Sequence, residues 1–98
     1  MRSVGPKRIN AEITRSNRKN KKLVARFTYK GKKYTIHFGD KRYQHYRDKT
    51  GYYSSQDHND LDRRRRYRKR ASKIKNKKGL YTFQDPTSPN YFSYYVLW

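Results

Sequence analysis

The sequence predicts a small α+β domain, in which an antiparallel β-meander of three or four strands packs with one basic helix and an extended aromatic C-terminal segment. Three observations support this class. Apolar and polar residues alternate over residues 8–38, and a period of two is typical of half-buried strands. Residues 57–78 begin with acids and continue with bases, the order that the helix dipole favours. Residues 81–98 are rich in aromatic side chains.

Length and charge bound the kind of protein. Ninety-eight residues suit one small domain, which we take to span residues 1–98. The chain has 27 Lys and Arg against 7 Asp and Glu, a net charge of +20, and all of its bases precede Gly79. There is no cysteine to form a disulfide. No apolar run approaches the ~20 residues of a membrane span.

The N-terminal half predicts the meander. Residues 1–7 contain Gly5-Pro6 and indicate an extended arm. Strands are expected around 9–13, 23–29 and 34–38, with a two-residue turn at Lys30-Gly31. That turn places the apolar side chains of the hairpin on one face, which a shift of one residue would destroy. The pairs it predicts are Tyr29 with Lys32, Phe27 with Tyr34, Ala25 with Ile36 and Leu23 with Phe38.

The stretch 57–78 predicts a basic helix. Asp57, Asp60 and Asp62 suit its first turn, with Asp57 or Asn59 as N-cap and Gly79 at its end. An apolar stripe at i, i+4 and i+7 is expected to pack against the sheet; it consists of Tyr67, Ala71 and Ile74.

The cations of this helix point to an anionic partner. Four adjacent arginines repel one another, and no acid lies within the run to relieve them. We therefore expect the run to bind nucleic acid or another acidic partner. The candidate residues are Arg63, Arg64, Arg65, Arg66, Arg68, Lys69, Arg70, Lys73, Lys75, Lys77 and Lys78.

The sequence contains no recognisable catalytic pattern. His37, His45 and His58 are best explained as a strand-surface, a loop and a helix-start residue, and the three aspartates as acids of a helix start. A glycine-rich phosphate loop, a nucleophile constellation and a dinucleotide fingerprint are all missing. We expect no enzyme, no cofactor and no metal.

The aromatic residues have two interpretations. The C-terminal set either completes the core or anchors the chain on another protein, since aromatic side chains are the usual anchors of interfaces. That set consists of Tyr91, Phe92, Tyr94, Tyr95, Leu97 and Trp98. The tyrosines between the sheet and the helix either stack on exposed bases or fill the core. They are Tyr43, Tyr46, Tyr52, Tyr53 and Tyr67.

From about Ala11 onwards the chain resembles a family of small, basic, functionally uncharacterised proteins of large nucleocytoplasmic DNA viruses. That family shares a His-Phe-Gly after a hairpin, a basic Arg-Arg-x-x-Tyr helix and a final Asp-Pro…Trp element. The matching residues here are His37, Phe38, Gly39, Tyr43, His58, Arg64, Arg65, Tyr67, Asp85, Pro86, Leu97 and Trp98. The resemblance implies a viral origin and a place in the virus particle, with no catalytic residues to carry over.

Together these observations predict a virion structural protein: a small basic minor capsid or capsid-lining component, synthesised in the cytoplasm or nucleus of the host cell. Its expected partners are other capsid proteins and packaged double-stranded DNA, bound through phosphates without sequence preference. The alternative is a non-specific DNA-binding protein that condenses or packages the viral genome. Both roles need cations, so the sequence leaves both open.

Overall fold

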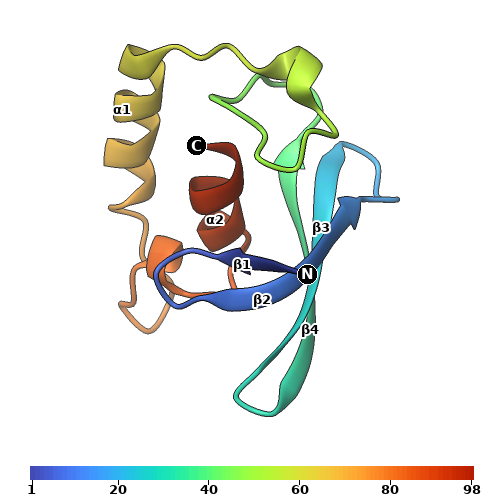
Figure 1. Ribbon diagram of the computed structural model, residues 1–98. Helices are drawn as coiled ribbons and strands as arrows, with labels where there is room; N and C mark the ends of the chain where they lie inside the picture. Colours follow the sequence, from blue (N-terminus) through green and yellow to red (C-terminus); the bar gives the residue numbers. More distant parts are fainter.

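The computed structural model describes all of residues 1–98 and contains one antiparallel sheet, with helical segments packed on one side of it (Figure 1). The strands follow in the order β1-β2-β3-β4, so the predicted α+β class and antiparallel meander are confirmed. The strands are β1 (Arg2–Val4), β2 (Ile9–Arg15), β3 (Lys21–Tyr29) and β4 (Lys32–Asp40). The helices are α1 (Leu61–Ala71), α2 (Pro89–Phe92) and a π-helix, η3 (Ser93–Leu97), with short 3-10 turns η1 (Ser54–Gln56) and η2 (Thr82–Gln84).

The hairpin between β3 and β4 has the predicted register. The four expected pairs are all present: Tyr29 with Lys32, Phe27 with Tyr34, Ala25 with Ile36, and Leu23 with Phe38. Lys30 and Gly31 both have positive φ angles, 51° and 78°, which a type I′ turn requires. The phenyl ring of Phe27 also stacks on Tyr34, with ring centroids 5.5 Å apart.

Residues 1–7, predicted as an extended arm, instead contain a strand of the sheet over residues 2–4 and the start of the turn that follows it. Arg2–Val4 forms β1, which pairs with the start of β2 and places Val4 opposite Ile9. Both side chains are buried. A strand of three residues is too short to show an alternation in the sequence, which is why the pattern did not reveal it.

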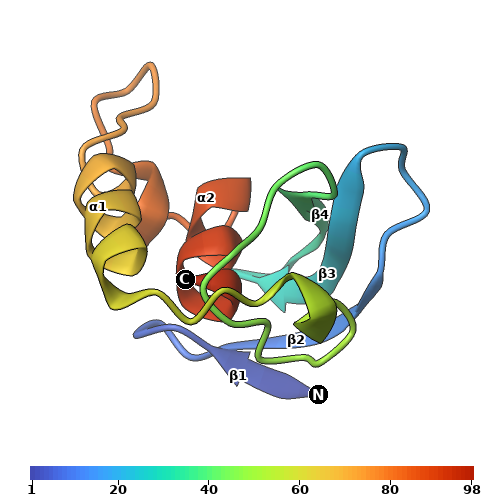
Figure 2. The ribbon, with the colours of Figure 1, turned by 90° about the horizontal axis from the view of Figure 1, so that it is seen from above.

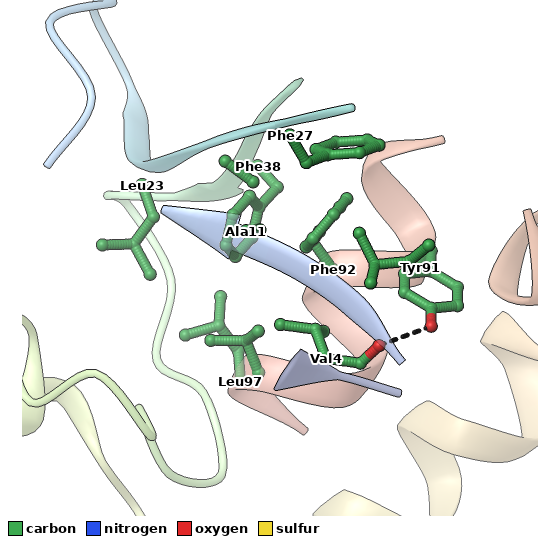
Figure 3. Packing of buried hydrophobic residues seen from close by; sticks show 11 residues of the cluster. Val4, Ala11, Leu23, Phe27, Phe38, Tyr91, Phe92 and Leu97 are labelled. Atoms are coloured by element: carbon green, nitrogen blue, oxygen red, sulfur yellow. Dashed lines mark hydrogen bonds between the residues drawn. The ribbon is translucent and has the colours of Figure 1, made fainter. Parts of the chain in front are cut away.

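The core lies between the sheet and the C-terminal segment (Figure 3). Eleven buried residues form it, seven from the strands and four from residues 91–97. They are Val4, Ile9, Ala11, Leu23, Ala25, Phe27 and Phe38, with Tyr91, Phe92, Val96 and Leu97. The hydroxyl of Tyr91 donates to the main-chain oxygen of Val4 at 2.7 Å, which joins the two ends of the domain.

The C-terminal segment is helical over residues 89–97 instead of extended. Its start is capped by Ser88, whose hydroxyl accepts from the N–H of Asn90, and Pro89 occupies the first helical position. An almost wholly apolar run suits a buried helix as well as a buried strand, so periodicity alone cannot separate the two. The helical form places Tyr91, Phe92 and Val96 in the core.

The basic helix is shorter than predicted. It begins after Asp60, whose carboxylate accepts from the N–H groups of Asp62 and Arg63, and it ends at Ala71 instead of continuing to residue 78. Beyond it, the side-chain oxygen of Asn76 accepts from the N–H groups of Lys78 and Leu80. Such local bonds compete with helix formation, and here they hold a hairpin turn.

The expected packing of this helix on the sheet is wrong. Helix α1 packs on the C-terminal segment instead: the phenol ring of Tyr67 stacks on the indole of Trp98, and the side-chain amide of Asn90 donates to the main-chain oxygen of Ala71 at 3.1 Å. Ile74, the third residue of the predicted stripe, lies beyond the helix and is exposed. The helix does not reach the apolar face of the sheet, because the C-terminal segment covers that face.

Candidate functional site

The eleven candidate lysines and arginines do not all face solvent. Two of them, Arg64 and Arg68, bind other parts of the domain. The Nε groups of Arg64 and Arg68 donate to the main-chain oxygen of Trp98 at 2.8 and 3.1 Å. Their guanidinium groups also lie over the rings of Tyr46 and Tyr94, 5.0 and 4.6 Å from the centroids. These contacts hold α1 against the C-terminal segment and use the face of the helix that points inward.

A second face of α1 lines an open cleft of about 500 Å³. Arg63, Arg66 and Arg70 share this face because positions i, i+3 and i+7 lie nearly above one another on a helix. Arg66 and Arg70 are exposed, whereas Arg63 is half-buried and donates to the side-chain oxygen of Gln44 at 3.0 Å. The cleft is therefore lined by a column of guanidinium groups.

The opposite wall of the cleft comes from the sheet and adds more positive charge. Lys21 and Lys22 at the start of β3 line it, together with Asp40 at the end of β4. Arg42 binds both carboxylate oxygens of Asp40, at 3.0 and 2.8 Å, and these bonds lower the pKa of Asp40 to about 2. Four cations thus face the cleft, Arg63, Arg66, Arg70 and Lys21, and its one acid is neutralised by a further arginine.

A buried chain of polar groups fixes the shape of this wall. Lys22 is 1% exposed, and its ammonium donates to the main-chain oxygen of Tyr43 at 2.6 Å and to Nδ1 of His45 at 2.7 Å. Since a carboxylate can only accept, Nε2 of His45 carries the proton and donates to Asp57 at 2.5 Å. These hydrogen bonds therefore connect residues 43–57 to the sheet.

Burial governs the titration of these groups. Removal from water lowers the pKa of Lys22 to about 8, although nearby carboxylates of Asp48, Asp40 and Asp57 oppose the shift. The pKa of His45 is also lowered, first by burial and then by the Lys22 charge. Lys22 and His45 were not candidates in the sequence, because their burial comes from contacts between segments that are distant along the chain.

The same contact changes the role of Asp57. It was expected in the first turn of the basic helix but lies before that helix, where it accepts from His45 and from the main-chain N–H of Asp48. The cap is provided by Asp60 instead of Asp57 or Asn59. No group of three His, Cys, Asp or Glu side chains is placed to hold a metal ion.

The other candidate bases lie on the outer surface. Arg65 and Lys69 are exposed on the face of α1 that points away from the core, and Arg65 makes only a 3.7 Å contact with the exposed Asp62. The remaining four, Lys73, Lys75, Lys77 and Lys78, are exposed in the hairpin that follows α1. These six are free to meet an anionic partner without rearrangement.

The C-terminal candidates belong to the core of the domain itself. Tyr91, Phe92 and Leu97 are fully buried. The other three are half-buried and pack against neighbouring rings: Trp98 stacks on Tyr67, while Tyr94 and Tyr95 meet Phe83 and Tyr91 at tilted angles. Of the two interpretations of this segment, the structure therefore supports core packing, because none of these six side chains is mostly exposed.

The central tyrosines differ in their availability. Tyr46, Tyr53 and Tyr67 are half-buried, whereas Tyr43 is 65% exposed and lies at the cleft. Tyr52 is also exposed, away from the cleft. Tyr43 is thus the tyrosine placed to stack on a group bound among the cleft cations.

Comparisons with protein-family models, with curated proteins and with solved structures found no match to this chain. The resemblance to the viral family stays a prediction. None of the helices is both long enough and apolar enough to cross a membrane.

Proposed function

We propose that the protein binds nucleic acid through its phosphates, without reading sequence, and that the cleft beside α1 is the centre of the contact. The observation that carries this proposal is the convergence of four cations on one cleft from two separate elements, with the only acid there neutralised by Arg42. Cleft cations of this kind contact phosphate oxygens, which carry no sequence information.

Nucleic acid explains the charge better than a small anion does. The molecule carries a net charge of +20, and exposed lysine and arginine side chains continue from the cleft over the outer face of α1. A small anion would neutralise only a few of these charges. A polymer of phosphates can neutralise many, and it releases condensed counterions as it does so.

The test compares two pairs of substitutions that remove the same charge from one helix. Arg66→Gln with Arg70→Gln changes the cleft face, and Arg65→Gln with Lys69→Gln changes the outer face. Binding of two unrelated 20-base-pair duplexes is measured over a range of salt concentrations. If both cleft arginines contact phosphates, the slope of log K against log salt becomes shallower by about 1.8 in the cleft variant.

The cleft variant should weaken binding equally for both duplexes, and the outer-face variant should weaken it less. Equal losses in the two variants would place the contact elsewhere on the surface. A loss confined to one duplex would contradict binding through phosphates alone. Absence of binding by the unaltered protein would overturn the proposal.

We propose the virus particle as the setting of this binding, on the resemblance to the viral family alone. In that setting the protein lines the capsid or condenses the genome. Its contacts with other capsid proteins would use the exposed cations against acidic surface, because the C-terminal aromatic residues are buried in its own core. Detection in purified particles that keep it after nuclease treatment would favour the capsid role, and its release with the DNA would favour the condensing role.

A further inference from the structure

The segment after α1 is a small, well-defined hairpin. The N–H of Asn76 donates to the oxygen of Leu80 and that of Thr82 to the oxygen of Ile74, both at 2.9 Å, while Lys75 pairs with Tyr81. The side chain of Asn76 closes the tip by accepting two N–H groups. In Figure 2 this hairpin projects from the body beyond the end of α1.

The hairpin exposes two aliphatic side chains that lie outside the hydrophobic core. Ile74 is 52% and Leu80 57% exposed. Because side chains alternate along paired strands, Ile74 and Leu80 lie on one face of the hairpin, and Lys75 and Tyr81 lie on the other. Two neighbouring aliphatic side chains on one face of a projecting hairpin form a small apolar patch, and we take this patch as a contact surface for a partner.

The charge around these side chains defines the partner. Lys73, Lys75, Lys77 and Lys78 flank them, and no acid occurs between Asp62 and Asp85. The partner is therefore anionic and has an apolar surface between its charges. Duplex DNA meets this description, since its base pairs lie between two rows of phosphates.

The position of the hairpin links it to the cleft. Arg70 lines the cleft at the end of α1, and Lys73 begins the hairpin three residues later. One duplex can thus contact both without a break in the row of cations. Two aliphatic side chains offer too little apolar surface to anchor a protein in lipid. Minor-groove proteins, in contrast, use one or two apolar side chains as wedges between base steps.

We propose that this hairpin enters the minor groove of duplex DNA, where Ile74 and Leu80 wedge against a base step and the four lysines contact the flanking phosphates. The inference rests on the proposed function and adds a mode of binding to it. Partial unstacking at the wedge bends the duplex towards the major groove. The protein is then an architectural DNA-binding protein, whose preference follows the deformability of the sequence and not its base edges.

The experiment measures bending and affinity separately. A 30-base-pair duplex with a donor and an acceptor dye at its ends reports bending, and 2-aminopurine at a central TA step reports unstacking. The full chain is compared with the variant Ile74→Ser with Leu80→Ser. Leu61→Ser is the matched control, because Leu61 is 58% exposed at the start of α1 and lies outside the hairpin.

The full chain and Leu61→Ser should both bend the duplex and raise 2-aminopurine fluorescence. The hairpin variant should lose both signals while its Kd rises less than about fivefold and its salt slope is unchanged, since the phosphate contacts remain. Retained bending in the hairpin variant would overturn the proposal, as would binding by the full chain without bending. If instead the variant loses only its binding to vesicles containing phosphatidylserine, the hairpin contacts lipid. If the full chain does not bind DNA at all, the proposed function itself fails.

Discussion

The indole of Trp98 and the phenol ring of Tyr67 are stacked, with centroids 4.1 Å apart and planes inclined by 9°. This pair is the main apolar contact between the basic helix and the rest of the domain, because the other side of α1 faces solvent. The centroid of the indole also lies 5.1 Å from that of the His58 imidazole. Trp98 therefore holds both the helix and the segment that leads into it.

Loss of this stack should release the helix. Trp98→Ala removes a half-buried aromatic side chain but keeps the main-chain oxygen that Arg64 and Arg68 bind. We expect the free energy of unfolding to fall by about 2 kcal/mol, less than for a fully buried tryptophan. Urea denaturation measures this loss, and hydrogen exchange should accelerate over residues 61–71. Tyr52→Ala, an exposed aromatic in the same domain, should change neither quantity.

Two glycines separate backbone strain from steric overlap. Gly5 and Gly31 both have positive φ angles, 69° and 78°, so alanine is strained at either position. A Cβ at Gly31 meets nothing, whereas a Cβ at Gly5 would overlap the phenol of Tyr91. We expect Gly31→Ala to cost about 1 kcal/mol of stability and Gly5→Ala about 3 kcal/mol. Equal costs in denaturant titrations would show that the Tyr91 ring can move aside.

Stability should rise with pH in the alkaline range. The folded-state pKa of Lys22 is lowered to about 8, so above pH 8 the unfolded chain, whose lysine keeps its ordinary pKa, binds more protons than the folded one. Stability therefore increases as pH rises towards the ordinary pKa of lysine, about 10.4. The pKa values of Tyr67, Tyr91 and Tyr95 are raised by burial, and they reverse the trend above about pH 10.

The measurement is the free energy of unfolding at pH 8, 9 and 10 in the protein and in Lys22→Met. The substitution removes the titrating group, so the free energy of unfolding of the variant should rise less steeply between pH 8 and 10. An unchanged alkaline slope in Lys22→Met would mean that other groups control stability between pH 8 and 10.

His45 acts in the acid range. Its pKa is lowered, so its contribution to stability is lost as pH falls below about 6.5.

The hairpin β3–β4 could be predicted because two independent signals agree there. The alternation from Leu23 to Phe38 and the turn at Lys30-Gly31 select the same register, and one buried face enforces it. The end of α1 could not be predicted in this way. Lysine is a good helix former and residues 73–78 contain no Gly or Pro, so no strong stop signal precedes Gly79; the bonds of the Asn76 side chain depend on the turn that they stabilise.

The sequence predicted three of the arginines that line the cleft, but not the cleft itself. The arginines of its helix face were candidates because they lie in one charge run, but their division between Trp98, the cleft and solvent depends on how the helix docks. The opposite wall comes from Lys21 and Lys22, which are some forty residues away and are not distinguished from neighbouring bases in the sequence. A site built by packing distant segments leaves no local signal.

The hydrogen bond between Tyr91 and Val4 has a consequence for how the chain folds. The two partners are 87 residues apart, and the sheet has no cover until residues 91–97 reach it. Closing so long a loop is entropically costly, so the domain should fold slowly for its size and in a single step. Until those residues are in place, we expect the chain to be an unfolded polycation, because its strands have no core to pack on. During synthesis it is therefore open to capture by RNA, and an RNA that held it would delay folding.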